Sequence, residues 1–134
     1  MENGAAASKK KVVIVVVEDD PYVLDFLRMS LEKQGYEVQT AEDGEQGLAL
    51  IQACLPVLVV MDLMLPKMDG AQILRRMSEA PVTAAIPVVV VSAYAASESM
   101  RRVIKSQKNV CEIFAKPLRT EEFLGTLKKL LHES

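Results

Sequence analysis

Three short, uninterrupted runs of aliphatic residues constrain the fold of this chain more than any other feature. They are Val12–Val17, Val57–Met61 and Val88–Val91, and none of them alternates with polar residues. A strand that is apolar on both faces is typical of the centre of a parallel sheet, where both faces are covered. Two weaker runs, Tyr36–Thr40 and Val110–Ala115, contain polar or charged residues and are typical of edge strands. We therefore expect five strands, three of them central.

Segments with apolar residues at helical spacing separate the five runs. They begin near Pro21, Gly44, Gly70, Ser97 and Thr120. Strands that alternate with helices in this way predict a parallel sheet with right-handed crossovers and helices on both faces. With the apolar strands in the centre, the strand order is 2-1-3-4-5. The predicted fold is thus α/β, a (βα)5 flavodoxin-like doubly wound sheet, in which ligands bind at the carboxyl ends of the strands.

Length and composition limit what else the chain contains. Its 134 residues suit a single domain, and we expect a flexible tail over residues 1–10 and one domain over residues 11–134. The formal net charge of −2 and the 4% of aromatic residues disfavour direct nucleic-acid binding. No apolar run approaches the roughly 18–20 residues that a membrane span needs, so we expect no membrane insertion. The predicted location is cytoplasmic.

The two cysteines offer no framework for a disulfide-rich or metal-binding fold. Cys54 and Cys111 belong to no CxxC motif and to no Cys/His cluster. We expect both to be buried small hydrophobic residues rather than metal ligands or redox centres.

Polar and charged side chains follow four of the five predicted strands at the point where each strand ends. They are Glu18, Asp19 and Asp20 after the first strand, Asp62 after the third, Ser92 after the fourth and Lys116 after the fifth. Because parallel strands end at the same edge of a sheet, we expect these side chains to converge. Carboxylates with few other protein ligands suit a Mg²⁺ ion that shares its shell with a phosphoryl group. An aspartate after a strand can also serve only as a helix cap, but four strand ends of this kind favour a magnesium site.

A magnesium ion at Glu18 and Asp19 would place Asp62 as a nucleophile toward phosphorus. Carboxylates form aspartyl phosphates, and the transfer depends mostly on positioning and charge neutralisation. Lys116 would contact one phosphoryl oxygen, and the Ser92 hydroxyl would donate a hydrogen bond to another. Taken singly, Lys116 is a surface lysine before a proline and Ser92 a strand-end cap. Their common location indicates phosphoryl transfer.

With these residues in place, the chain resembles the receiver domain of two-component response regulators over residues 11–133. The matching stretches are Val17–Pro21, Met61–Gly70, Val91–Ala93 and Phe114–Leu118. The resemblance implies that Asp62 is the phosphoacceptor. It also implies that Mg²⁺ is held by Glu18, Asp19, Asp62 and the backbone carbonyl of Met64. Pro66 and Gly70 would shape the loop that follows the phosphoacceptor.

One position near the predicted site departs from the usual receiver pattern, and two others affect how long the phosphoryl group is kept. Receivers commonly have Tyr or Phe three residues before the lysine, where this chain has Ile113. Strand alternation would point the adjacent Phe114 to the opposite face of the sheet. Tyr94 and Met64 occupy positions that in this family tune the access of water to the acyl phosphate. We expect these two bulky residues to slow the loss of the phosphoryl group.

The resemblance implies a phosphorylation-dependent switch in a phosphorelay, and not an enzyme with an external substrate. A sensor histidine kinase or a histidine phosphotransfer protein would phosphorylate Asp62. A downstream effector protein would bind the face formed by the fourth predicted strand, the helix that begins near Ser97 and the fifth predicted strand. A receiver cut from a longer polypeptide would show the same features. A phosphorylation-independent interaction module is supported by Ile113 but disfavoured by the intact acidic set. A phosphatase of the haloacid dehalogenase type would need a second acid where Met64 stands.

Overall fold

The computed structural model describes residues 12–132, apart from the side chains of Tyr94, Ala96 and His132. Strands and helices alternate along this part of the chain. The elements are β1 (Val13–Val17), α2 (Pro21–Lys33), β2 (Glu37–Ala41), α3 (Gly44–Cys54), β3 (Leu58–Met61), α4 (Gly70–Met77), α5 (Pro81–Ala84), β4 (Val88–Ser92), the 3-10 helix η1 (Ala93–Ala96), α6 (Glu98–Lys105), β5 (Val110–Ala115) and α7 (Thr120–His132). The predicted tail, residues 1–10, lies outside the described residues.

The five strands form one parallel sheet in the order β2-β1-β3-β4-β5, so the predicted fold is confirmed. The three central strands are buried at every residue except the half-buried Val13, as their uninterrupted aliphatic sequences predict. The edge strand β2 is half-buried at its first four residues, and β5 is buried only at Val110 and Ile113 and half-buried at its other residues. Burial on both faces thus separates the central strands from the edges.

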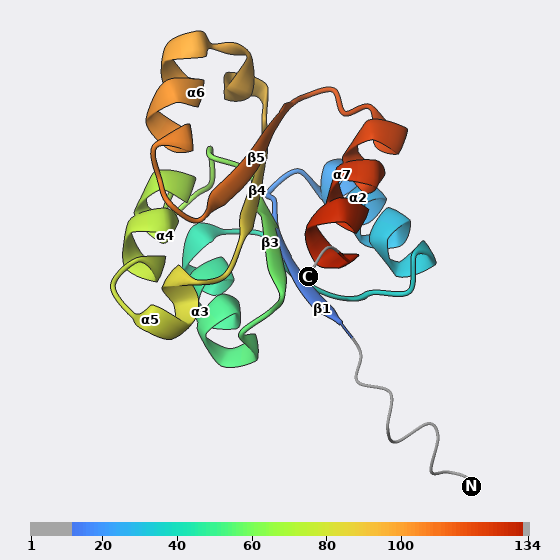
Figure 1. Cartoon of the computed structure of the whole chain (residues 1–134), viewed down its shortest axis with the longest axis horizontal. Helices are drawn as coiled ribbons and strands as arrows, with labels where there is room; N and C mark the ends of the chain where they lie inside the picture. The colour runs from blue at the N-terminus through green and yellow to red at the C-terminus, as the bar shows by residue number, and fades with distance from the viewer. Residues whose placement is uncertain (1–11, 133–134) are drawn as a thin grey trace, which may run out of the picture.

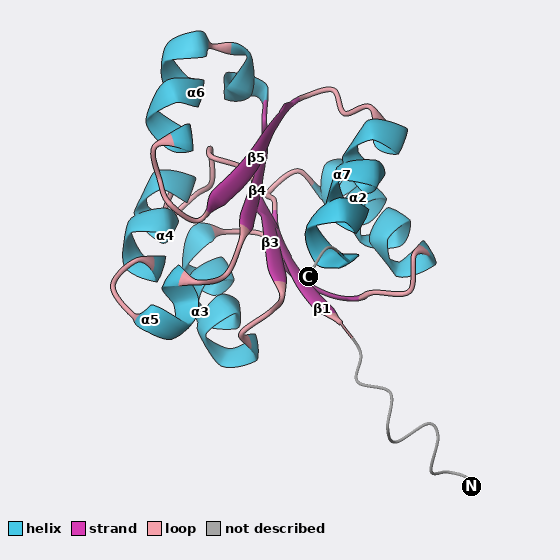
Figure 2. Cartoon of the chain, viewed as in Figure 1, coloured by secondary structure: helices cyan, strands magenta, loops and turns pink. Residues whose placement is uncertain are grey.

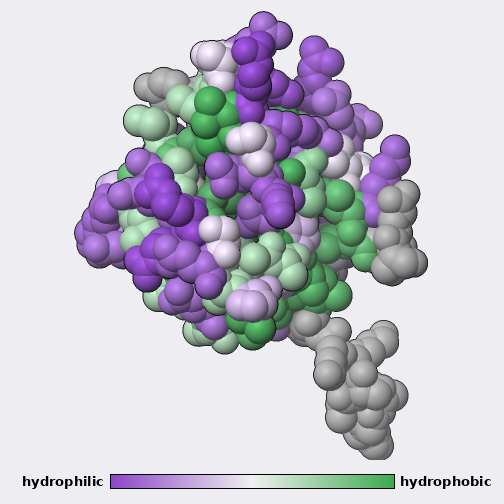
Figure 3. Space-filling model, turned by 60° about the vertical axis from the view of Figure 1, so that its left-hand side comes forward, coloured by the Kyte–Doolittle hydropathy of each residue, from purple (hydrophilic) through white to green (hydrophobic). Residues whose placement is uncertain are grey.

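Helices cover both faces of the sheet, as Figures 1 and 2 show: α2 and α7 lie on one face, and α3, α4, α5 and α6 lie on the other. Alternate residues of the strands point into two separate cores. Val15, Val59 and Val90 pack in the core under α3, α4 and α6. Ile14 and Val60 pack in the core under α2 and α7. The surface turned forward in Figure 3 is mainly hydrophilic, with smaller hydrophobic areas between the polar side chains.

Aspartate side chains fix the starts of three helices just beyond the strand ends. Asp20 accepts hydrogen bonds from the N–H groups of Tyr22 and Val23 and caps α2. Asp43 caps α3, and Asp69 caps α4 within a capping box. Because each cap satisfies backbone donors that the helix leaves unpaired, each loop ends at a defined residue.

The structure differs from the prediction in a few local features. The short helices α5 and η1 were not predicted, because four residues are too few to show a helical period. Helix α6 ends at Lys105 with Ser106 as its C-cap, whereas the apolar spacing in the sequence predicts a helix from Ser97 to about Lys108. The prediction for Cys54 was wrong: it is the last residue of α3 and is exposed, and Cys111 on the edge strand is only partly buried. Among the described helices, none is long and apolar enough to cross a membrane.

Candidate functional site

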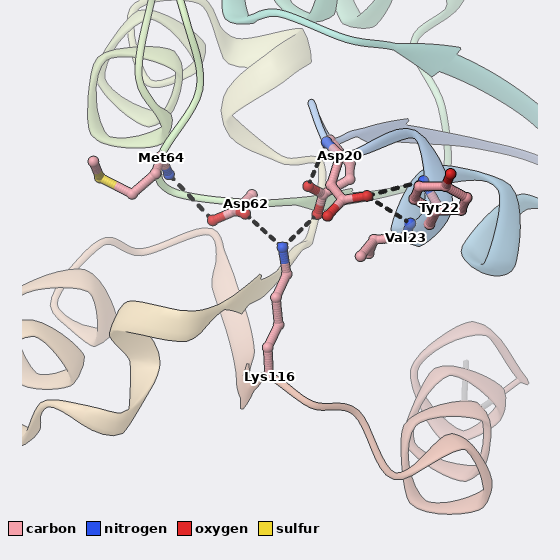
Figure 4. Close-up of polar contacts among 7 residues, drawn as sticks. Asp20, Tyr22, Val23, Asp62, Met64 and Lys116 are labelled. Atoms are coloured by element: carbon pink, nitrogen blue, oxygen red, sulfur yellow. Dashed lines mark hydrogen bonds and ion pairs between the residues drawn. The ribbon is translucent and has the colours of Figure 1, made fainter.

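The candidate site lies at the edge of the sheet where β1, β3 and β5 end. Glu18 and Asp19 follow β1, Asp62 follows β3, and Lys116 follows β5. These residues are far apart in the sequence, but the parallel order of the strands brings their side chains to one place. Figure 4 shows Lys116 reaching across this edge toward Asp62.

Lys116 joins the two buried carboxylates of the site. Its ammonium group donates a hydrogen bond to Oδ2 of Asp62 at 2.8 Å. It also lies 2.8 Å from Oε1 of Glu18, as an ion pair. Burial alone would lower the pKa of Lys116, but the hydrogen bonds and charges of Asp62 and Glu18 outweigh it and raise the pKa above the ordinary value. Lys116 is therefore a fixed positive charge at neutral pH.

Glu18 is a buried carboxylate whose surroundings do not fully compensate its charge. Its exposed fraction is 1%. Oε2 accepts a hydrogen bond from the N–H of Asp20 at 3.0 Å. Oε1 lies beside the Lys116 ammonium group as an ion pair. Burial raises the pKa of Glu18, against the opposing effects of Lys116 and the Asp20 N–H, and the charge of Asp62 raises it further.

Both carboxylate oxygens of Asp62 have a hydrogen-bond donor. Oδ1 accepts from the N–H of Met64 at 3.1 Å, and Oδ2 accepts from Lys116. The backbone N–H of Asp62 also donates to the carbonyl of Val17 at 3.1 Å, which continues the β1–β3 ladder by one residue. The side chain is thereby held in one orientation, with 8% of its surface exposed.

The carboxylates of Glu18, Asp19 and Asp62 fit a hard divalent cation. One oxygen from each lies within 4.8 Å of the others, and Asp19 is exposed while the other two are buried. An acidic group of this kind is common on protein surfaces, but here two of its members, Glu18 and Asp62, are buried. A Mg²⁺ ion takes carboxylate oxygens and keeps several waters, which suits a group with one side open to solvent.

The other predicted site residues, Ser92, Met64 and Tyr94, lie around this centre at different positions. Ser92 is fully buried at the end of β4, and its carbonyl accepts a hydrogen bond from the N–H of Lys116 at 3.2 Å. Met64 is 53% exposed, and its side chain extends away from Lys116 in Figure 4. Tyr94 belongs to η1, and its side chain lies outside the described part of the structure. The carboxylates and Lys116 therefore form the centre of the site, with Ser92 on the neighbouring strand end.

Ile113 and Phe114 face opposite sides of the sheet, as strand alternation predicts. Ile113 is 5% exposed and packs in the core under α4 and α6. Phe114 packs on the other side against Phe123, with their ring centroids 5.4 Å apart in an edge-to-face arrangement. Phe114 thus does not take the place of the aromatic residue that receivers commonly have at position 113.

One contact near the site could not be predicted from the sequence. Gly44, at the start of α3, donates a hydrogen bond from its N–H to the carbonyl of Pro66 at 3.1 Å. Pro66 lies in the loop that follows Asp62. A glycine at a helix start is too common to indicate such a contact, so only the structure shows that α3 touches this loop.

Known proteins and a protein family resemble this chain in sequence. A family model described as "Response regulator receiver domain" matches residues 14–128. The chain is 35% identical over 116 residues to the DNA-binding dual master transcriptional regulator RpaA of Synechocystis, covering 87% of this chain and 47% of that protein. It is 31% identical over 113 residues to protein PilH of Pseudomonas aeruginosa, covering 84% and 92%. The chain spans about half the length of several of these relatives.

Solved structures show the same fold. A CheY-like receiver domain protein from Methanospirillum hungatei matches with a TM-score of 0.82 and 27% identity, over 92% of this chain and 96% of that chain. The chemotaxis response regulator CheY4 of Vibrio cholerae matches with a TM-score of 0.82 and 23% identity, over 91% and 100% of the two chains, which shows the fold alone. By its sequence match and its fold, the chain belongs to the response regulator receiver domain family.

Proposed function

We propose that this protein is a signalling switch in which Asp62 accepts a phosphoryl group. The observation that supports this most is the position of Lys116 between Glu18 and Asp62, beside the exposed Asp19. One cation and three carboxylates at a single sheet edge are the groups that phosphoryl transfer to a carboxylate needs. Asp62 is the phosphoacceptor in this proposal.

The donor in the proposed reaction is the phosphohistidine of a sensor histidine kinase or of a histidine phosphotransfer protein. An oxygen of Asp62 bonds to phosphorus as the phosphorus–nitrogen bond breaks, and the electron pair of that bond stays on the imidazole nitrogen. Lys116 and the Ser92 hydroxyl contact phosphoryl oxygens and offset their charge. Glu18, Asp19, Asp62 and the Met64 carbonyl would hold Mg²⁺, which supplies further positive charge to the phosphoryl oxygens when bound.

The proposed output is a change on the face formed by β4, α6 and β5. Ser92 ends β4 and is followed directly by η1 and α6, so a phosphoryl group that binds Ser92 would pull on this segment. Met100 and Val103 on α6 are exposed hydrophobic residues, 38% and 59% accessible, on the face where a protein partner would bind. A downstream effector protein is the proposed partner.

The proposed unit is the receiver domain over residues 11–134, acting in the cytoplasm through protein contacts rather than by binding nucleic acid directly. Its reaction is its own phosphorylation and slow dephosphorylation, so it is not proposed as an enzyme with an external substrate. Several relatives are about twice as long as the segment that matches, and RpaA is described as DNA-binding. That property belongs to RpaA, and this chain is proposed to supply only the phosphoaccepting domain.

Intact-mass measurement with a small phosphodonor tests this proposal. The protein is incubated with Mg²⁺ and acetyl phosphate, and its mass is followed over time. We expect one phosphoryl group to add to the wild-type protein and to Asp69→Asn, a variant of a nearby aspartate, and none to add to Asp62→Asn. No adduct on the wild-type protein at any donor concentration would favour the phosphorylation-independent module instead.

A further inference from the structure

The start of α3 lies unusually close to the loop that connects β3 to α4. This connection, residues 62–69, is here called the acceptor loop. Gly44 donates its N–H to the carbonyl of Pro66 at 3.1 Å. A Cβ atom placed on Gly44 would lie 1.6 Å from the carbonyl oxygen of Met68 and 2.5 Å from its carbonyl carbon. Any side chain at position 44 would therefore displace the backbone of the acceptor loop.

The part of the acceptor loop that touches Gly44 is held in a strained conformation. Lys67 has a φ of 71°, in the left-handed region that side chains other than glycine rarely adopt. The N–H of Met68 donates to the carbonyl of Pro66 at 2.8 Å, which closes a three-residue turn. Pro66 thus accepts from Gly44 and from Met68 at once. A strained turn persists only where its surroundings hold it in place, and the contact with Gly44 is part of those surroundings.

An ion pair joins the same two segments at their surface. Lys67 Nζ lies 3.6 Å from Oδ2 of Asp43, the N-cap of α3. The hydrogen bond from the Gln46 N–H holds the pKa of Asp43 below its ordinary value, and the charge of Lys67 adds to this effect. Asp43 is thus charged at neutral pH and keeps the start of α3 at this position.

The next turn of helix α3 packs closely against the sheet. Its next turn carries Gly47, where a Cβ atom would lie 2.7 Å from Cγ1 of Val17. The helix therefore already packs directly on β1. Because this packing restricts movement of the helix, we expect a larger residue at position 44 to displace the acceptor loop.

The segment from the last residue of β2 to the start of α3 also touches the other side of the candidate site. The N–H of Glu18 donates to the carbonyl of Ala41, the last residue of β2, at 3.0 Å. Three residues further along, Gly44 holds Pro66. One short segment thus contacts both the β1 end, with Glu18 and Asp19, and the loop that follows Asp62.

We propose that Gly44 is a positioning residue for the metal and phosphoacceptor site. It lets the acceptor loop lie directly on the start of α3, and this sets the separation between the Glu18–Asp19 pair and the Asp62–Met64 segment. The role rests on the proposed function, because it concerns the geometry in which the same residues hold Mg²⁺. Gly44 itself contacts neither the carboxylates nor the phosphoryl group and acts only through the acceptor loop.

Calorimetric titration with Mg²⁺ tests this role separately from activity. The variants are Gly44→Ala and two controls. Gly125→Ala adds the same methyl group on α7, where nothing lies within 4 Å of the new Cβ. Leu130→Ala removes a partly buried side chain from the core on the other face. We expect the Mg²⁺ dissociation constant to rise at least about tenfold in Gly44→Ala, as for other residues that orient metal ligands, and to stay within about twofold of wild type in both controls.

The results separate the two proposals. A wild-type protein that binds no Mg²⁺ and accepts no phosphoryl group from acetyl phosphate contradicts the proposed function. A functional wild type with a folded Gly44→Ala that binds Mg²⁺ as tightly contradicts only the role of Gly44.

Amide hydrogen exchange in the wild-type protein keeps the test valid if Gly44→Ala does not fold. Coupling between two sites is reciprocal, so Mg²⁺ binding should strengthen the contact of Gly44 with Pro66. We expect saturating Mg²⁺ to slow exchange of the Gly44 amide about fivefold. The Leu55 amide, bonded to Ile51 at the other end of α3, should respond clearly less. No change at Gly44, or an equal change at Leu55, would contradict the proposal.

Discussion

The ammonium group of Lys116 donates a hydrogen bond to Oδ2 of Asp62 across 2.8 Å, although 54 positions separate the two residues in the sequence. The same ammonium group lies 2.8 Å from Oε1 of Glu18. Two neighbouring buried carboxylates repel one another, and this single cation offsets their charge. The carboxylates of the site are thus organised around Lys116.

Replacement of Lys116 by methionine should destabilise the protein in the absence of Mg²⁺. The change keeps most of the side-chain volume but leaves Glu18 and Asp62 without their cation. We expect the free energy of unfolding at neutral pH to fall by about 2 kcal/mol, less than for a fully buried pair because Lys116 is partly exposed. Urea denaturation measures this.

The matched control is Lys129→Met on α7, an exposed lysine, which should change the free energy of unfolding by less than about 0.5 kcal/mol.

The stabilisation of the fold by Lys116 should also depend on pH. Because the pKa of folded Lys116 is raised above its ordinary value of 10.5, this stabilisation is complete below pH 10.5 and is lost as the pH rises through the folded-state pKa. Equal stability of Lys116→Met and wild type at neutral pH would show that the cation is not needed.

Glu18 should make the metal-free protein less stable as the pH rises. Its pKa in the folded state is raised above the ordinary value of 4.5, so between the two pKa values the folded protein binds more protons than the unfolded chain. Stability therefore falls as the pH rises from 4.5 through the folded-state pKa. Glu18→Gln should remove this component and be at least as stable as wild type at neutral pH. Thermal unfolding over a pH series without Mg²⁺ measures this pH dependence. If Glu18→Gln shows the same pH dependence as wild type, the buried charge of Glu18 does not destabilise the folded protein as predicted.

Asp19 should contribute to metal binding but little to the stability of the metal-free protein. It is the exposed member of the carboxylate group, so Asp19→Asn should change the free energy of unfolding by less than about 0.5 kcal/mol without Mg²⁺. Added Mg²⁺ should raise the melting temperature of wild type, because a ligand that binds only the folded state stabilises it. This increase should be much smaller in Asp19→Asn and unchanged in Asp25→Asn, an exposed control on α2. A full Mg²⁺ effect in Asp19→Asn would remove Asp19 from the metal site.

The apolar runs made the sheet predictable, whereas several local features were not. The strand Leu58–Met61 is apolar and buried at every position, and burial on both faces is the physical reason for such a sequence. The residues at the strand ends could be predicted to converge because parallel strands share one edge. Cys54 shows the limit of composition: cysteine is often buried, but its position at the end of a surface helix leaves it exposed.

The contact between Gly44 and Pro66 could not be predicted for a different reason. It depends on where a loop lies relative to a helix from another part of the chain, and neither segment has a periodic pattern that reports it. The left-handed backbone of Lys67 is equally hidden, because lysine has no preference for that conformation. Short-range patterns predict elements and strand ends, while loop-to-helix contacts depend on tertiary packing.

The lifetime of the phosphorylated state remains a prediction about Met64 and Tyr94. We expect replacement of both with serine to accelerate loss of the phosphoryl group severalfold, because water would reach the acyl phosphate more easily. Met64 is exposed, so its replacement should cost little stability. The decay of the phosphorylated protein after removal of acetyl phosphate measures the rate by intact mass. An unchanged lifetime in the double variant would show that these side chains do not control the access of water.

Identification of the phosphorylated residue tests the central claim most directly. The protein is phosphorylated with acetyl phosphate and Mg²⁺, and the acyl phosphate is then reduced with borohydride, which converts a phosphorylated aspartate to homoserine. Peptide mass spectrometry locates the product. We predict homoserine at position 62 and at no other aspartate, and no product from Asp62→Asn treated in the same way. Product at another residue, or a wild-type protein that shows none under conditions where its fold is intact, would contradict the account.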